Sequence, residues 1–257
     1  MTALQILELK LGLPEEIKLS QSVGSLFHGV LMEHIDSDYC DFLHQQALRP
    51  YSQYVYFDRE RQGLYWRISS LNETAAQEVV QAAKELPQFI HLKQKNIDVC
   101  ILSRKIISSS DYSGLAEKYF AASVNVLDVE YNFYTSCTFK TEDAYALFPQ
   151  PQLLLGSLVK KWNSFADGEF LSERGLAADL AQQVYVYGYN LRLQPFALEK
   201  ISIPAFRGTY TLALKNNIMT GKIICMLADF AAYSGVGIKT ALGMGACKAK
   251  FITGRKK

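Results

Sequence analysis

The chain has 257 residues, of which 49% are hydrophobic and 20% are charged. These are ordinary values for a globular protein, and they exclude a disordered or low-complexity chain. The formal net charge is only +2, from 27 Lys and Arg residues against 25 Asp and Glu residues. Such a near-neutral total gives no sign of the basic surface that nucleic-acid-binding proteins usually carry.

Membrane and redox features of the sequence favour a cytoplasmic protein. No apolar run approaches the ~18–20 residues that span a bilayer, and the first residues lack the pattern of a signal peptide. The five cysteines are widely spaced in apolar surroundings, without a CxxC pair or a Cys/His ligand spacing. We therefore expect reduced core cysteines, no metal site and no membrane partner.

The first half of the chain predicts strands and helices in the order β, α, β, β, α, β. Alternating apolar residues and aromatic or β-branched runs indicate the strands, and apolar residues at helical spacing indicate the helices. The expected strands are 4–12, 51–57, 63–70 and 97–107, and the expected helices are 22–35 (with Ser22 as N-cap), 38–46 and 73–86. This order is typical of a ferredoxin-like unit.

The second half predicts another unit of the same kind, with extra helices after its first strand. The expected strands are 126–138, 185–193, 201–214 and 246–252, and the expected helices are 153–165, 175–183 and 217–232. A weak composition shift near 108–111 marks the boundary. The predicted fold is therefore α+β, with two tandem ferredoxin-like (RRM-like) domains at 1–110 and 111–257.

Charge is distributed very unevenly along the chain. Residues 198–257 contain ten Lys or Arg and two acidic residues, a net charge of +8, so residues 1–197 carry −6. Such a basic segment is either a solvated face with a Lys-rich tail or the contact surface for a polyanion.

A glycine-rich loop lies inside this basic segment. Four of the chain's sixteen glycines fall within eleven residues: Gly235, Gly237, Gly243 and Gly245. Glycine lets successive backbone N–H groups converge on an anion, and Lys239 and Thr240 add a charge and a hydroxyl. The spacing matches neither a P-loop nor a dinucleotide fingerprint, and the loop follows a helix rather than a strand. A tight turn that packs the last helix on the sheet is the alternative.

This loop, Gly-x-Gly-x-Lys-Thr-x-x-Gly-x-Gly between a helix and a short strand, resembles that of the RAMP superfamily of CRISPR-associated proteins. The resemblance is closest to the repeat-cleaving endoribonuclease, the sixth numbered Cas family. The segments 24–29, 134–140, 148–151 and 157–163 are also similar to that family. The resemblance implies two ferredoxin-like domains and cleavage of CRISPR repeat RNA without metal or cofactor, with effector-complex subunits as further partners. It also implies that the loop residues listed above bind RNA.

The resemblance further implies a catalytic histidine in a Leu-His context just after the first helix, which His44 matches. Histidine suits proton transfer at neutral pH, and a nearby Arg49 would stabilise the phosphate. His28, which lies off the apolar stripe of the first helix, is the reserve candidate. We expect His34 in the core and His91 on the surface.

Two alternative functions stay open from the sequence. The family's catalytic tyrosine corresponds to Met32 here, and Arg49 stands near the position of its lysine. A non-catalytic RNA-binding RAMP subunit of an effector complex would show such departures, and a protein–protein scaffold is a third possibility.

The aromatic residues of the predicted hairpin, Tyr54, Tyr56, Tyr65 and Trp66, are interpreted as core.

Overall fold

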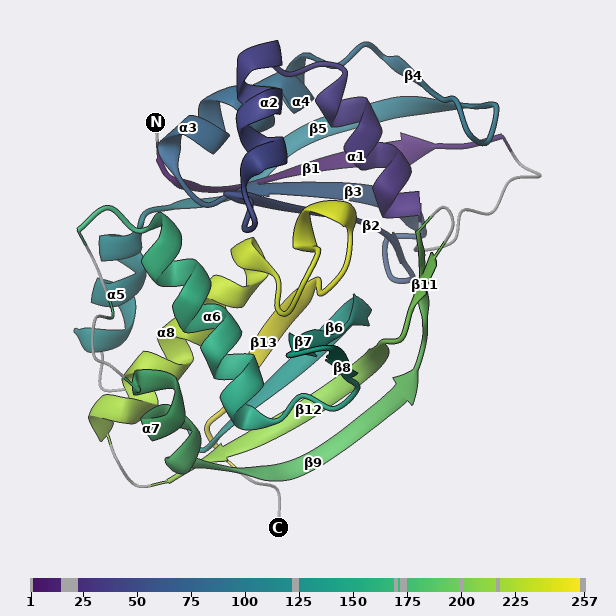
Figure 1. Ribbon diagram of the computed structural model, residues 1–257. Coiled ribbons are helices and arrows are strands. Elements are labelled where there is room, and N and C mark those ends of the chain that lie inside the picture. Colours follow the sequence, from purple (N-terminus) through teal and green to yellow (C-terminus); the bar gives the residue numbers. More distant parts are fainter. Residues whose placement is uncertain are drawn as a thin grey trace. The chain divides into compact units, whose positions relative to one another are not determined.

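The structure is a computed structural model that describes residues 2–14, 23–121, 125–168, 171, 175–198, 201–215 and 218–254. The chain forms two compact units, which are treated one at a time here (Figure 1). Unit 1 comprises the residues up to Ser110 together with Lys239–Gly243. Unit 2 comprises Asp111–Ile238 and the residues from Met244 onward. The middle of the glycine loop therefore belongs to the first unit, and its two arms belong to the second.

Unit 1 is a five-stranded antiparallel sheet with helices on one face (Figure 1). The elements are β1 (Leu4–Gly12), α1 (Gly24–Met32), α2 (Ser37–Gln45), β2 (Tyr51–Asp58), β3 (Gly63–Ser70), the successive helical segments α3 (Glu73–Ala75), η2 (Ala76–Val80) and α4 (Gln81–Glu85), β4 (Phe89–Leu92), β5 (Ile97–Ser110) and η3 (Thr240–Leu242). The strand order β2-β3-β1-β5 is that of a ferredoxin-like sheet, and β4 adds an edge strand beside β5.

Alternation along the strands places the core of unit 1 between sheet and helices. Leu7, Leu9 and Leu11 of β1 are buried in one cluster with Phe27 and Leu31 of α1. The aromatic hairpin residues are also buried, as predicted: Tyr54, Tyr56, Tyr65 and Trp66. Three cysteines are buried, whereas Cys40 and Cys100 are half-buried.

Unit 2 repeats the plan with insertions. Its elements are α5 (Tyr112–Phe120), β6 (Asp128–Cys137), β7 (Phe139–Thr141), β8 (Ala144–Ala146), α6 (Pro151–Phe165), α7 (Leu176–Gln182), β9 (Val184–Leu193), β10 (Phe196–Leu198), β11 (Ile201–Ile203), β12 (Phe206–Leu214), α8 (Ile218–Ser234) and β13 (Cys247–Ile252). The sheet order β13-β6-β12-β9 is again ferredoxin-like. The predicted α+β class with two such units is confirmed.

The short strands β4, β7, β8 and β10 were not predicted, and three further differences concern particular residues. The strand expected over 201–214 is divided between β11 and β12, because Pro204 has no N–H for a ladder. Helix α5 was not predicted, although Asp111 caps it by accepting a hydrogen bond from the Gly114 N–H at 2.7 Å. His34 is exposed rather than in the core, because α1 ends at Met32 and the helical period ends with it.

Two further points concern particular residues. Ser22, the predicted N-cap of the first helix, lies outside the described residues. His91 is exposed, as predicted, and its Nδ1 lies 2.7 Å from Asp98 Oδ1. No helix in the described part of the chain is long and apolar enough to cross a membrane.

Candidate nucleic-acid cleavage site

Helix α1 places His28 against the first residue of β2. Phe27 and Leu31 anchor the buried side of this helix, and His28 next to them is half-buried. His28 Nδ1 lies 2.8 Å from the hydroxyl oxygen of Tyr51, and the two rings are nearly parallel, at 18°. The tyrosine ring is fully buried, so it holds the imidazole in one orientation.

The protonation of His28 is set by its surroundings. Its pKa is lowered to about 4, chiefly by burial and in smaller part by the positive charges of Arg49 and His44. Burial also raises the pKa of Tyr51 above its ordinary value, so the phenol stays protonated. At neutral pH the pair is therefore a neutral imidazole hydrogen-bonded to a neutral phenol.

Helix α2 carries His44 in its last turn. The helix starts with a side-chain cap, in which Asp36 Oδ1 accepts from the N–H groups of Asp38 and Tyr39 at 2.9 and 3.1 Å. Leu43 is the buried residue of this helix, which leaves the neighbouring His44 exposed. Its Nδ1 lies 3.9 Å from Cys40 Sγ, one helical turn earlier. His44 thus presents its imidazole to solvent from the end of a capped helix.

Arg49 follows α2 and precedes the strand that carries Tyr51. Its side chain is half-buried, and its Nε is buried without a hydrogen-bond partner among the described residues. The positive charge of its guanidinium acts to lower the pKa of both His28 and Tyr51. A buried N–H donor without an acceptor is costly unless a ligand supplies one.

Three nitrogen-bearing side chains thus come from α1, α2 and the segment before β2, and the charges of Arg49 and His44 are near enough to act on His28. Within the described ranges, none of His28, His44 and Arg49 is hydrogen-bonded to a carboxylate. Cationic and neutral donors that are not hydrogen-bonded to a carboxylate are suited to a phosphate ligand. No three His, Cys, Asp or Glu side chains of the described residues gather as a metal site would require.

The glycine-rich loop connects α8 to β13. All four of its glycines have positive φ, between 61° and 100°. At Gly245 a Cβ atom would collide with the carbonyl oxygen of Val236, so this position requires glycine. The tight-turn interpretation of the loop therefore describes its backbone correctly.

Most of this loop is buried rather than open to a ligand. Gly235, Gly243, Gly245 and Thr240 are buried, Gly237 is half-buried and Lys239 is exposed. The glycine amides of the loop do not converge on an anion as expected, because all four N–H groups donate within the protein, that of Gly243 to Thr240 O at 3.4 Å. The N–H groups of Gly235, Gly237 and Gly245 donate to Ala231 O, Ser157 Oγ and Ser136 O, each at 2.9 Å.

Helix α6 holds one arm of the loop in a way that sequence reasoning missed. Lys161 is buried, and its Nζ donates to the carbonyl oxygens of Ser234 and Gly235 at 3.0 Å each. Burial lowers the pKa of this lysine to about 7. Ser157, one turn earlier, accepts the Gly237 N–H. The 157–163 segment noted above contains both residues, but a lysine in a sequence is expected at the surface.

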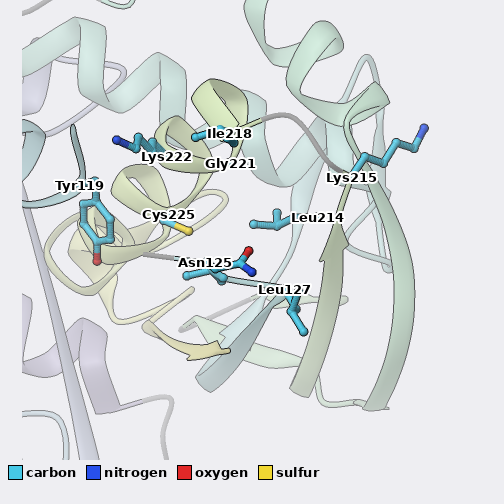
Figure 2. Close-up of a pocket in the computed structure, with 10 residues that line it drawn as sticks. Tyr119, Asn125, Leu127, Leu214, Lys215, Ile218, Gly221, Lys222 and Cys225 are labelled. Atoms are coloured by element: carbon cyan, nitrogen blue, oxygen red, sulfur yellow. The ribbon is translucent and has the colours of Figure 1, made fainter. Parts of the chain in front are cut away.

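The basic C-terminal segment is only partly available for a polyanion. Lys215 and Lys222 donate to the carbonyl oxygens of Gln182 and Phe120. They border a pocket of about 300 Å³ in unit 2 that contains none of the predicted site residues, and Lys215 extends away from it (Figure 2). Residues 200 and 255–257, which carry four of the ten positive charges, lie outside the described residues.

Comparisons with known proteins all point to one family. Residues 131–247 match the family model of the CRISPR-associated endoribonuclease Cas6. The chain is 31% identical over 252 residues to that endoribonuclease from Mycobacterium tuberculosis, covering 98% of this chain and 79% of the relative. It is 29% identical over 229 residues to the one from Streptococcus thermophilus, covering 89% and 92%. A solved Cas6 product complex shares the fold with a TM-score of 0.78, at 22% identity, over 96% of this chain and 100% of that one.

Proposed function

This chain belongs to the CRISPR-associated endoribonuclease Cas6 family, and on that premise we propose that it cleaves CRISPR precursor RNA within the repeats to make guide RNAs. The observation that carries the proposal is the arrangement in unit 1 of His28 bonded to Tyr51, an exposed His44, and an Arg49 Nε that is buried without an acceptor among the described residues. Because all five cysteines are free thiols, we propose a cytoplasmic location as well. Binding to effector-complex subunits is a further part of the proposal.

The chemistry uses a nucleophile that RNA itself carries. The 2′-oxygen attacks the adjacent phosphorus while its proton passes to a base, and the bond from phosphorus to the 5′-oxygen breaks as that oxygen receives a proton. The products are a 2′,3′-cyclic phosphate and a 5′-hydroxyl. The protein need only transfer protons and stabilise the charge that develops on the phosphorane.

Proton transfer is assigned to His44. Its imidazole is exposed at the end of α2, whereas His28 is half-buried and bonded to Tyr51. A pKa of about 4 makes His28 a weak base and leaves it neutral at pH 7. We therefore give His28 a supporting role, in which the imidazole held by Tyr51 contacts the RNA as a neutral hydrogen-bonding group.

Charge stabilisation is assigned to Arg49. Its Nε is buried without an acceptor in the described part of the chain, so a phosphate oxygen would complete its hydrogen bonding. The guanidinium keeps its charge at every pH of interest, which suits it to stabilise the phosphorane rather than to donate a proton.

RNA binding is assigned to the glycine loop, mainly through Lys239. This is the exposed residue of the segment 239–243, and η3 within that segment packs against α1 and β2. The loop glycines Gly235, Gly237, Gly243 and Gly245, with Thr240, would act by shaping the backbone that presents this lysine.

The test is single-turnover cleavage of the chain's own repeat RNA in EDTA, with end-group analysis of the products. We expect cleavage without added metal, and no cleavage of an RNA that has 2′-deoxyribose at the scissile position. His44→Ala should reduce the rate about 10²–10⁴-fold, the usual size of a proton-transfer contribution. His91→Ala is the matched control, because His91 is exposed on β4 at the opposite edge of the sheet from β2.

Two results would overturn these assignments. A wild-type rate in His44→Ala would remove His44 from the mechanism. Cleavage that occurs only with added metal would exclude a metal-independent attack by the 2′-hydroxyl. Tight, salt-dependent repeat binding with no strand scission would instead identify the non-catalytic RNA-binding subunit, since phosphate contacts weaken steeply with ionic strength.

A further inference from the structure

We propose that Gln53 is a positioning residue, whose buried amide holds the tip of the glycine loop (residues 239–243) against the start of helix α1. In this way Lys239 of the tip and His28 of the helix would meet one RNA segment with a constant geometry. The inference rests on the proposed function, and nothing in the sequence patterns singled out Gln53.

The amide of Gln53 makes three hydrogen bonds to three separate parts of unit 1. Its Nε2 donates to Gly24 O at 2.7 Å and to Ala241 O at 3.0 Å. Its Oε1 accepts from Trp66 Nε1 at 2.8 Å. The residue is 1% exposed, so no water competes for these bonds. One side chain of β2 thus joins α1, the loop tip and β3.

The chemistry of the partners permits only one orientation of this amide. An indole N–H can only donate, and the two backbone carbonyls can only accept. The Gln53 oxygen must therefore face Trp66, and its NH₂ group must face Gly24 and Ala241. Each of the two amide hydrogens then has one acceptor, and the group has no freedom to flip.

The backbones of the helix and the loop tip meet directly beside this amide. A Cβ atom on Gly24 would lie 2.5 Å from Leu242 O and 2.9 Å from Gly243 Cα. Both sides of the contact are glycine, and a methyl group on either would force the two segments apart. Gln53 therefore joins two segments that are already in close backbone contact, which leaves the tip little room to shift.

The same helix carries the imidazole of the proposed site. His28 follows Gly24 by four residues, about one helical turn or 6 Å along the axis. A displacement of the tip relative to Gly24 is thus a displacement of Lys239 relative to His28. Misplacement of about 1 Å in such an arrangement costs up to about 10²-fold in rate.

The experiment is a double-mutant cycle on RNA affinity and cleavage with Gln53→Met and Lys239→Ala. Methionine keeps the length of the side chain and removes all three hydrogen bonds. Gln5→Met is the matched control, because Gln5 is also a buried glutamine of this sheet but its side-chain amide donates to the nearby Thr2. Thermal melts establish that each variant is folded at the assay temperature, and Gln53→Glu replaces Gln53→Met if the latter does not melt cooperatively.

We expect Gln53→Met to weaken binding of the repeat RNA about tenfold, while Gln5→Met binds as the wild type does. In the Lys239→Ala background the same change should have less than about a twofold effect, because residues of one network are not additive. The ¹⁵N–¹H signal of the Trp66 indole should shift in Gln53→Met and stay in place in Gln5→Met.

Fully additive effects of Gln53→Met and Lys239→Ala would overturn the proposal, and so would wild-type affinity and cleavage in Gln53→Met. A wild-type protein that binds repeat RNA without cleaving it would refute the proposed cleavage function, but the double-mutant cycle on RNA affinity would still test the role of Gln53. A wild-type protein that does not bind repeat RNA would overturn both.

Discussion

His28 should bind its proton in the folded protein only near pH 4, against an ordinary value of 6.5. Burial is the main cause, and the charges of Arg49 and His44 add to it. The difference corresponds to roughly 3 kcal/mol, at 1.36 kcal/mol per pKa unit. The unfolded chain takes up this proton as the pH falls through 6.5, whereas the folded chain does so only near 4. The folded state should therefore lose up to roughly 3 kcal/mol between these values.

Two measurements check this prediction. The pKa is read from the imidazole NMR signals during a pH titration, and His28 is identified among the four histidines by the signal that disappears in His28→Gln. Denaturant unfolding at pH 7 and pH 4 then gives the acid-dependent loss of stability. Glutamine can still hydrogen-bond to Tyr51 but has no proton to bind, so the variant should lose roughly 3 kcal/mol less than the wild type on acidification.

The reasoning has a clear point of failure. A folded-state pKa of 6 or above for His28 would mean that the imidazole is not desolvated beside Arg49. An equal loss of stability in wild type and His28→Gln would show that other groups cause the acid sensitivity. Arg49→Met separates the two causes of the shift, since removing the like charge should raise the pKa of His28 without exposing it.

Three further changes test other parts of the structure. Glu8 accepts hydrogen bonds from two arginines and has a pKa of about 2. Glu8→Gln should therefore cost about 3 kcal/mol in denaturant unfolding at pH 7. A loss below about 0.5 kcal/mol would contradict a buried ion pair. The pKa of Lys161 is lowered to about 7, so wild-type stability should rise between pH 7 and 10, and Lys161→Met should show no such rise. Gly24→Ala should lower the free energy of unfolding by about 1–3 kcal/mol, because the new Cβ would meet the loop backbone. Gly29→Ala in the same helix meets nothing and should raise it by about 0.5–1 kcal/mol. Equal effects of the two changes would refute the close contact.

The sequence by itself determined the order of the main strands and helices of each unit and the resemblance to the family. Strand alternation and helical spacing are local properties, so the two β, α, β, β, α, β series could be recognised without knowing what they pack against. The glycine loop was recognisable because its spacing is unusual and continuous in the chain. His44 was singled out by the family resemblance, which implies a catalytic histidine just after the first helix. Its catalytic role stays a prediction.

The tertiary structure decided which distant residues meet. His28 and Tyr51 are 23 residues apart, and Gln53 and Ala241 are 188 residues apart, so no periodic pattern connects them. Sheet order and loop closure bring each pair together, and burial then lowers the pKa of His28 by removing water from its ring. Burial of Lys161 follows in the same way from packing. The local pattern specifies which side chains face inward, but only the packed fold specifies what they face.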